Sequence, residues 1–539
     1  MMLDGLCPLT TGLALDRASA IVPTNEALVT GDSRITFDEL RTAVDETAGA
    51  LLASGVDKGD HVAICLGNGI PWATLFLAIT SIGAVAVPVN TRFQAAELEY
   101  VLRQSKSRML FVADKFLKVD FIAMLRQVLP AMDDRCGNAR EGALPDLERI
   151  VVLGDDIPAA AEGFADFLQA GSARTSPRGA SPDDVALIQY TSGTTAFPKG
   201  VLLTHRSLCA DAFFSGGRMG LRVGDRYHSA RPFFHVAGTT LSLLSSLQHA
   251  ATLITMDRFE PGAALTQMEV ESCTHFSGND TMALMLLGHP SLSARRLNLR
   301  GAWLAASPAI VARVIDDLGA TEAVVGYGLS EAAPNVAQSA WWEPRELRVG
   351  GWMAPEPGVR VRIVDPDGGD CPAGMVGEIL VSGWNVMRGY YAMPEQTAAA
   401  LDVDGWLHTG DLGVLDADGR LRFVGRAKEI IRVGGENVSP AEVEDVLHSH
   451  PDIKQAVVVG VADERLVEVP FAFVAVGNGA ELDEQTVIAW SKNMMAGFKV
   501  PRHVMFVDDF EEIGMTASGK VQKTAAARVA NDHLSGSSR

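Results

Sequence analysis

A stretch without charged side chains or histidine runs from residue 62 to residue 91 and is long enough to cross a bilayer. Gly67-Asn68-Gly69 and Pro71 interrupt it near its start, and Gly83 and Pro88 interrupt it near its end. Turn signals at both ends of a short apolar helix are typical of a β-α-β unit and argue against a membrane helix. We therefore predict a strand, a helix and a strand over residues 62–66, about 72–82 and 84–89.

The same alternation of strand and helix patterns continues to about residue 330. Residues 34–37 have a strand pattern, and Thr36 with Glu39 forms a capping box at the start of a helix that Gly55 ends. Another strand is predicted just before residue 190, where Val185-Ala186-Leu187-Ile188 is apolar. A long series of alternating elements predicts the α/β fold class.

From about residue 342 the pattern changes to short strands separated by Asp-Gly and Pro-Gly turns. The segments 359–364, 377–381 and 419–425 predict a β-rich subdomain. A short charged run follows at residues 426–429, where we place a domain boundary. Ser439-Pro440-Ala441-Glu442 then begins a helix by two signals, a capping box and proline at the first helical position.

Composition narrows the possible functions. The 539 residues carry 46 Lys plus Arg against 66 Asp plus Glu, a formal net charge of −20, which argues against nonspecific binding to nucleic acid or anionic membranes. The cysteines are scattered and form no C-x-x-C pair, so they predict neither a disulfide framework nor a zinc site. This cysteine pattern predicts a reducing cytoplasm. Because Asp4 is acidic and no basic segment precedes an apolar core, we expect no secretory signal.

The segment from Tyr190 to Gly200 has the composition of a phosphate-binding loop. Hydroxyl side chains, glycine-exposed backbone N–H groups and Lys199 would together surround the phosphates of ATP. The alternative is a polar surface loop between two strands, because Ser, Thr and Gly are ordinary loop residues. The segment is not a Walker A loop, since Gly200 follows Lys199 where that motif requires Ser or Thr.

Four other positions could carry chemistry, each with an ordinary alternative. Glu331, at the end of a predicted strand, could hold Mg²⁺ or be a solvated carboxylate. Asp411 could accept hydrogen bonds from ribose hydroxyls or be a turn residue. His235, in an apolar segment, could be a core histidine. Lys520 could be a solvated lysine, or belong to a P-loop kinase or NTPase, although Val521 replaces the hydroxyl residue of that motif.

Taken together and in order, six segments resemble the adenylate-forming superfamily of acyl-CoA synthetases, luciferases and peptide-synthetase adenylation domains. These segments are 190–200, 327–331, 405–411, 425–430, 434–440 and 519–520. The resemblance spans most of the chain, and it is specific because six motifs occur in the expected order. By its Gly-Gly-Glu-Asn-Val-Ser-Pro motif, the chain looks more like the CoA ligases than the carrier-loading domains.

The resemblance implies a fold and a reaction. The expected domains are an N-terminal ATP- and acyl-binding domain over 1–425, with two α/β lobes and a β-barrel-like lobe, a hinge over 426–429 around Lys428, and a small mobile α+β domain over 430–539. A carboxylate attacks the α-phosphorus of MgATP to give acyl-AMP and pyrophosphate, and a thiol then displaces AMP. The implied cofactors are ATP, Mg²⁺ and coenzyme A.

The resemblance also assigns roles to individual residues. The β- and γ-phosphates would be held by Thr191, Ser192, Gly193, Thr194, Thr195 and Lys199. Glu331 would hold Mg²⁺, Ser330 would bond the α-phosphate, and Tyr327 would stack on adenine. The remaining expected site residues are Asp411 and Arg426 at the ribose, Lys520 at the reacting carboxylate and α-phosphate, Ser307 in a segment lining the adenine and acyl pockets, His235 at the acyl pocket, and Gly434 and Gly435 along the pantetheine path.

Three departures from the usual motifs concern the phosphate loop and the acid. Ala196 replaces a glycine of the phosphate loop, which removes some backbone freedom there. Ala305-Ala306 replaces Gly-Gly beside the acyl pocket, and its extra methyl groups should narrow that pocket. Asn279-Asp280 replaces an apolar-Pro pair and adds polarity near the acyl side. We therefore expect a compact acid, short- to medium-chain or aryl, rather than a long fatty acid.

Three alternatives stay open at this stage. The acyl group could pass to a carrier protein or another nucleophile, the chain could be a non-catalytic ATP or acyl-AMP sensor, or it could be a P-loop enzyme. The preferred partners are a small-molecule carboxylic acid and coenzyme A, with no nucleic acid and no integral membrane segment. The sequence does not decide whether the chain forms a homodimer, which acid it uses or in which pathway it acts.

Overall fold

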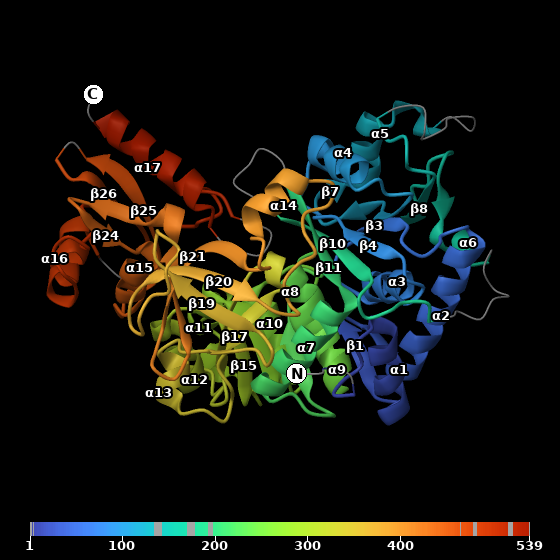
Figure 1. The fold of residues 1–539 in the computed structure, drawn as a ribbon, viewed down its shortest axis with the longest axis horizontal. Helices are drawn as coiled ribbons and strands as arrows, with labels where there is room; N and C mark the ends of the chain where they lie inside the picture. Colours follow the sequence, from blue (N-terminus) through green and yellow to red (C-terminus); the bar gives the residue numbers. More distant parts are fainter. Residues whose placement is uncertain are drawn as a thin grey trace.

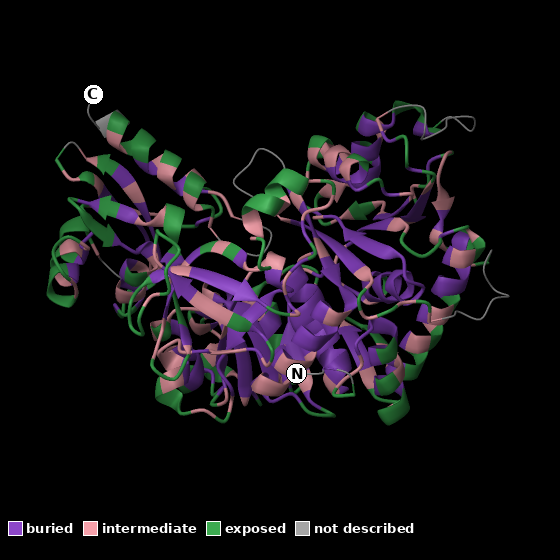
Figure 2. Cartoon of the chain, in the orientation of Figure 1, coloured by how far each residue is buried: buried purple, intermediate pink, exposed green. Residues whose placement is uncertain are grey.

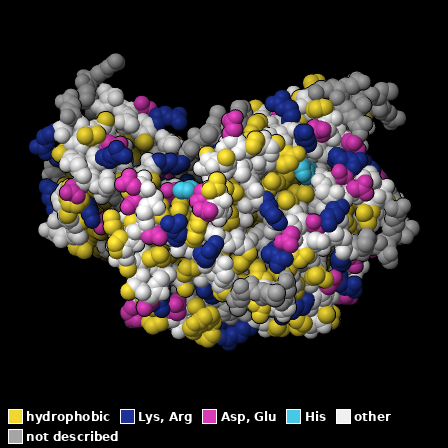
Figure 3. Space-filling view, in the orientation of Figure 1, with side chains coloured by type: hydrophobic (Ala, Val, Ile, Leu, Met, Phe, Trp, Pro, Cys, Tyr) yellow, Lys and Arg dark blue, Asp and Glu magenta, His cyan; other side chains and the backbone are white. Residues whose placement is uncertain are grey.

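The computed structural model describes residues 3, 5–133, 143–169, 178–191, 198–463, 465–477, 482–515 and 521–537. A large N-terminal body carries a smaller C-terminal part, which lies at the upper left in Figure 1. Buried residues gather in the sheets and central helices of the large body (Figure 2). The surface is notched between the two parts, and acidic and basic side chains are interspersed around it (Figure 3).

The first sheet has seven strands and contains the predicted β-α-β unit. Strands β3 (His61–Cys65) and β4 (Val85–Pro88) pair in parallel, and helix α3 (Ile70–Ser81) connects them, which confirms the prediction. In the part of the chain that the structure describes, no helix combines the length and apolar character needed to cross a membrane. The strand order is β11 (Lys199–Thr204), β10 (Val185–Thr191), β4, β3, β5 (Met109–Ala113), β8 (Arg149–Leu153) and β9 (Glu162–Gly163).

The candidate phosphate loop connects β10 with β11, which pair antiparallel. Tyr190 lies opposite Gly200 and Thr191 opposite Lys199, so the two ends of the loop are held side by side. This arrangement differs from a Walker A loop, which leads from a strand into a helix. Ser192, Gly193, Thr194, Thr195 and Ala196 lie outside the described residues.

The second sheet has nine strands; Tyr327 lies in it, and His235, Ser307, Ser330 and Glu331 follow its strands. Its order is β18 (Ala354–Pro355), β17 (Asn335–Gln338), β16 (Val324–Gly328), β15 (Gly301–Ala305), β14 (His275–Asn279), β12 (Arg226–Ser229), β13 (Thr252–Thr255), β1 (Glu26–Thr30) and β2 (Ser33–Thr36). The strands from β16 to β1 pair in parallel. From β12 the chain continues to β13 on one side and then returns to β14 on the other.

Helices α1 (Thr11–Ile21), α2 (Phe37–Ala53), α3 and α7 (His205–Met219) pack on one another within the body. Helix α2 begins with the predicted capping box, in which the Glu39 amide donates to Thr36 Oγ1 and Glu39 Oε2 accepts from the Thr36 amide. The other helices of the body are α4 (Ala95–Gln104), α5 (Phe121–Val128), α6 (Phe164–Gln169), α8 (Val236–Gly238), α9 (Ser245–His249), α10 (Pro261–Val270), α11 (Asp280–Leu287), α12 (Pro308–Asp317), α13 (Arg345–Val349) and α14 (Pro394–Ala400).

A four-stranded antiparallel sheet confirms the predicted β-rich subdomain. Its order is β19 (Arg360–Val364), β20 (Gly377–Ser382), β21 (Leu407–Leu415) and β22 (Leu421–Arg426). Ile379, Val381 and Leu421 join the main core of the large body. This sheet is therefore packed as part of the N-terminal body.

The C-terminal part has its own sheet and its own cores. The sheet is formed by β24 (Glu436–Val438), β23 (Ile431–Val433), β26 (Val467–Val476) and β25 (Ile453–Asp463), with β27 (His503–Phe506) beside β26. Its helices are α15 (Pro440–His448), α16 (Glu484–Met494) and α17 (Lys523–Ser537). Two buried clusters on opposite faces of β25 and β26 contain only residues of this part.

Candidate active site

Four parallel strands of the second sheet end at one edge, and each contains or is followed by a residue that the sequence analysis singled out. His235 follows β12, Asn279 ends β14, Ser307 follows β15, and Tyr327 lies in β16. The chain leaves β12 in one direction and returns to β14 from the other, so a topological switch point lies between these two strands. Ligands of open α/β sheets bind in the crevice at such a point, outside the carboxyl ends of the strands.

Tyr327, Asp411 and Arg426 form one contact group. The Tyr327 hydroxyl donates to Asp411 Oδ2 at 2.9 Å, and Arg426 Nε lies 3.3 Å from Asp411 Oδ1. Asp411 is 4% exposed, and burial raises the pKa of its carboxyl while the Arg426 charge opposes that rise. One face of the Tyr327 ring stacks on Phe423, with ring centroids 5.4 Å apart.

Glu331, Tyr390 and Lys199 form a second group at the end of the candidate phosphate loop. The Tyr390 hydroxyl donates to Glu331 Oε1 at 2.9 Å, and Lys199 Nζ lies 4.8 Å from the centroid of the Tyr390 ring. The Tyr391 amide donates to the Gly200 carbonyl, which holds this segment against β11. Sequence analysis missed Tyr390, because nothing in its local pattern links it to Glu331.

A tight turn carries Ser330 and Glu331 between β16 and β17. The Leu329 amide donates to the Pro334 carbonyl at 2.8 Å, which closes the turn, and the Met387 amide donates to the Glu331 carbonyl at 2.9 Å. Both side chains are half-buried. The turn thus presents a hydroxyl and a carboxylate at the sheet edge with its backbone fixed at two points.

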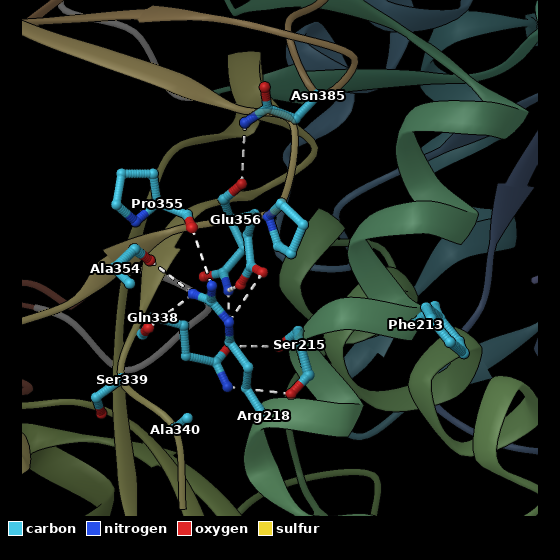
Figure 4. Close-up of polar contacts among 12 residues, drawn as sticks. Phe213, Ser215, Arg218, Gln338, Ser339, Ala340, Ala354, Pro355, Glu356 and Asn385 are labelled. Carbon is cyan, nitrogen blue, oxygen red and sulfur yellow. Dashed lines mark hydrogen bonds and ion pairs between the residues drawn. The ribbon is translucent and has the colours of Figure 1, made fainter. Parts of the chain in front are cut away.

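A buried polar network holds the far end of this turn at Asn335, and Figure 4 shows its members Glu356 and Asn385. The Asn335 amide donates to Asp211 Oδ2 at 2.7 Å, and its side-chain nitrogen donates to Glu356 Oε1 at 3.1 Å. Asn385 Nδ2 donates to the Asn335 carbonyl. Three side chains from distant parts of the chain therefore fix the start of β17.

Arg218 is the cation of this network (Figure 4). It donates to the carbonyls of Ala354, Pro355 and Gln338, and its Nε lies 3.4 Å from Glu356 Oε2. Burial raises the pKa of the Glu356 carboxyl to about 7 and raises the pKa of Asp211 as well. The Glu356 carboxyl thus lies beside the Arg218 guanidinium, behind the turn that carries Glu331.

The side chains of Asn279 and Asp280 both accept hydrogen bonds from backbone amides at the starts of helices. Asn279 Oδ1 accepts from the Met282 amide at 2.9 Å and caps helix α11. Asp280 Oδ1 accepts from the Ser307 amide at 2.8 Å and joins the start of α11 to the start of α12. Ser307 Oγ is buried and has no hydrogen-bond partner among the described residues.

His235 is half-buried and caps the short helix α8, because its Nδ1 accepts from the Ala237 amide at 3.2 Å. The neighbouring Phe234 carbonyl accepts from Gln189 Nε2 at 2.9 Å. Gln189 belongs to β10, so His235 lies where the two large sheets meet. This position is compatible with a site residue and differs from a fully enclosed core histidine.

Gly434, Gly435 and Lys428 have no described bond to the residues of this edge. Gly434 and Gly435 form the exposed tip of the β23–β24 hairpin, where their positive φ angles of +59° and +97° suit glycine. Lys428 is exposed in the short 3₁₀ helix η5 (Ala427–Glu429). Lys520 lies outside the described residues.

Comparison with known proteins identifies the family. The AMP-binding enzyme family matches residues 15–391, and the AMP-binding enzyme C-terminal domain matches residues 442–520. A methyl-dioxo-octahydroindenyl-propanoyl:CoA ligase from Mycobacterium tuberculosis is 39% identical over 523 residues, covering 95% of this chain and 97% of that protein. The mitochondrial medium-chain acyl-CoA ligase of Danio rerio is 32% identical, covering 93% and 85%.

A solved structure agrees with these relatives. The anthranilate CoA ligase AuaEII, crystallised with anthranoyl-AMP, superposes with a TM-score of 0.87 at 26% identity and covers 98% of this chain and 99% of that one. Its fold has the same large N-terminal and small C-terminal domains. The chain therefore belongs to the AMP-binding enzyme family, and the relatives that it matches over nearly its whole length make it one of the acyl-CoA ligases of that family.

Proposed function

We propose that this acyl-CoA ligase activates a compact carboxylic acid, short- to medium-chain or aryl. A carboxylate oxygen attacks the α-phosphorus of ATP, and the bond from that phosphorus to pyrophosphate breaks. The thiol of coenzyme A then loses its proton to solvent. The resulting thiolate attacks the acyl carbon of the acyl-AMP, and the bond from that carbon to AMP breaks. The single observation that carries the proposal is the match of both family domains in order along the chain.

The contact groups at the sheet edge support specific roles. Asp411 keeps acceptor capacity beyond its bond from Tyr327, because each carboxylate oxygen can accept two hydrogen bonds, so it suits the ribose hydroxyls together with Arg426. Lys199, Thr191 and the loop between them would hold the leaving pyrophosphate. Ser330 would bond the α-phosphate, and Lys520 would be delivered to the reacting oxygens by domain closure and stabilise the charge that develops there.

Glu331 fits a magnesium ion chemically. Its carboxylate is a hard oxygen donor, and only Oε1 carries the described bond from Tyr390. When bound, Mg²⁺ would neutralise phosphate charge during transfer. Tyr390 would orient the carboxylate, and the bond from the Met387 amide to the Glu331 carbonyl would hold the backbone beneath it.

Trp303 supports a compact acid more strongly than the alanines of the sequence motif. Its indole lies against Gly326, where a Cβ atom would meet the ring at 2.4 Å, and its Nε1 donates to Gln338 at 2.9 Å. This large side chain on β15 therefore fills space behind the sheet edge and would shorten any acyl pocket there. The names of the relatives also describe compact acids: a bicyclic propanoate, medium-chain acids and anthranilate.

Pyrophosphate release over a panel of carboxylic acids tests the proposal. We expect the highest kcat/KM with a short- to medium-chain or aryl acid, and acyl-CoA formation when coenzyme A is added. A parallel assay with a phosphopantetheinylated carrier protein should give little acyl transfer. Best turnover on hexadecanoate or a longer acid would refute the compact substrate. Loading of the carrier protein in preference to coenzyme A would refute coenzyme A as the acceptor.

A further inference from the structure

Arg231 directly follows β12 and reaches across to the end of β14. Its Nε donates to Ser277 Oγ at 2.7 Å and its Nη2 donates to the Gly278 carbonyl at 2.9 Å. The guanidinium lies 4.4 Å from the ring centroid of Trp303. The side chain therefore spans the topological switch point between β12 and β14, where the ligand crevice of this sheet is expected.

Arg231 shares with Arg348, which donates only to backbone carbonyls, the lack of a described carboxylate partner. Other half-buried arginines of the body lie beside carboxylates: Arg300 beside Asp225, Arg226 beside Glu271, and Arg218 near Glu356. In the part of the chain that the structure describes, Arg231 forms no ion pair, and its partners are a hydroxyl, a carbonyl and an indole face.

The guanidinium nevertheless keeps its charge. Burial lowers the pKa of Arg231 to about 10, so the group is still protonated at neutral pH. An enclosed cation without an anionic partner costs free energy, and an anionic or polar ligand at Arg231 would recover part of that cost. Arg231 is half-buried, and its Nη1 has no hydrogen-bond partner among the described residues, so donors remain for a ligand.

The surroundings place these donors on the acyl side. His235 lies four residues after Arg231, and Asn279 directly follows the Gly278 carbonyl that Arg231 contacts. Trp303 belongs to β15, whose end leads to Ser307. The ATP-side groups, Tyr327 with Asp411 and Glu331 with Tyr390, lie beyond β15 at β16 and its turn.

We propose that Arg231 determines the specificity of the acyl site by binding an oxygen at the distal end of the acid, a carboxylate or keto oxygen, while the other carboxylate is activated. The inference rests on the proposed function. Trp303 limits the length of the acid, and Arg231 beside it supplies the only described cation that contacts Trp303. The preferred substrates are thus compact oxo acids or dicarboxylic acids, not plain alkanoates.

The test compares matched acids from butanoate to octanoate: the plain acid, the acid with a terminal-side keto group, and the dicarboxylic acid of equal length. Pyrophosphate release gives kcat/KM for each with wild type, Arg231→Met and Arg231→Lys. Arg222→Met is the matched control, because Arg222 also lies over an indole, that of Trp341 at 5.3 Å, but on an exposed loop.

We expect wild type to prefer an oxygen-bearing acid over the plain acid by about 10- to 100-fold, because a hydrogen bond to a charged group is lost with the plain acid. Arg231→Met should abolish this ratio while retaining turnover of plain acids, Arg231→Lys should keep part of it, and Arg222→Met should leave it unchanged. The keto and dicarboxylate arms show which oxygen is bound.

A wild-type enzyme that turns over plain and oxygen-bearing acids equally well would overturn the inference while leaving the proposed function intact. An equal loss of activity on all acids in Arg231→Met, with folding confirmed by an unchanged thermal midpoint, would also overturn it and identify a structural link. Absence of pyrophosphate release with every acid would instead contradict the proposed function itself.

Discussion

At the scale of single residues, the site depends on buried side chains that have two tasks. Asp411 accepts a hydrogen bond from Tyr327 and lies beside Arg426, and its proposed second task is to accept the ribose hydroxyls of ATP. The two tasks can be separated, because Tyr327→Phe removes only the hydroxyl that donates to Asp411. Asp411→Asn instead replaces one acceptor oxygen with a donor group.

We therefore expect Asp411→Asn to raise KM for ATP in acyl-AMP formation by about 10- to 100-fold, since a hydrogen bond to a charged acceptor is lost. Tyr327→Phe should raise it by less than about tenfold, because Asp411 keeps both acceptor oxygens. Steady-state pyrophosphate release at varied ATP gives both values. Equal effects of the two changes would show that Asp411 acts only by holding Tyr327.

At the scale of elements, the sequence predicted those helices, caps and strands that depend on residues close together in the chain. The unit β3–α3–β4, the capping box of α2 and the β-rich sheet are confirmed because turn residues, caps and alternation act over a few residues. The contacts of Tyr390 with Glu331, and of Asp211 and Glu356 with Asn335, join residues far apart in the chain. No local pattern encodes such contacts, so sequence analysis missed these residues.

The Asn335 network makes a pH-dependent prediction at this scale. The pKa of Glu356 is raised from 4.5 to about 7 in the folded state, so the folded protein keeps a proton that the unfolded chain loses above pH 4.5. Stability must then fall as pH rises through this window, by up to roughly 3 kcal/mol. The nearby Arg218 charge lowers the pKa of Glu356, so the rise would be larger without it.

Glu356→Gln removes the titration while keeping an oxygen that can accept from Asn335. The thermal midpoint of Glu356→Gln minus that of wild type should therefore become more positive as the pH is raised from about 5 to about 8. Glu346→Gln, at an exposed position on α13, is the control and should show no such trend. A constant difference between Glu356→Gln and wild type across the range would contradict the raised pKa.

At the scale of the whole molecule, α15 packs against α12, and individual polar contacts such as that of Gln455 with Thr281 join the two domains in this arrangement. Arg258 pairs with Glu511 at 3.0 Å, but both side chains are mostly exposed, and such pairs contribute about 0–1 kcal/mol. Asp445 Oδ1 accepts from the Ala309 amide at 3.1 Å, so a carboxylate of the C-terminal domain caps helix α12. Ser307, expected in the ATP and acyl site, precedes that same helix.

The bond from the Ala309 amide to Asp445 could couple the position of the C-terminal domain to the half-reactions, because it lies beside Ser307. In this arrangement the Gly434-Gly435 tip is exposed and Glu511, on the segment leading toward Lys520, contacts the N-terminal body. We therefore predict that this arrangement serves acyl-AMP formation. Loss of a helix cap costs about 1 kcal/mol, or about fivefold in a population. Asp445→Ala should therefore slow acyl-AMP formation about fivefold and leave thioester formation from supplied acyl-AMP unchanged or faster.

Glu442→Ala is the matched control for this prediction, because Glu442 lies on the same helix α15 but pairs with Lys499 inside the C-terminal domain. Its two half-reactions should both stay near wild type. Single-turnover assays measure the half-reactions separately. An equal slowing of both half-reactions in Asp445→Ala would mean that Asp445 only stabilises α12. A slowing of acyl-AMP formation alone is the result expected if the bond between Asp445 and Ala309 belongs to one of two domain arrangements used in turn.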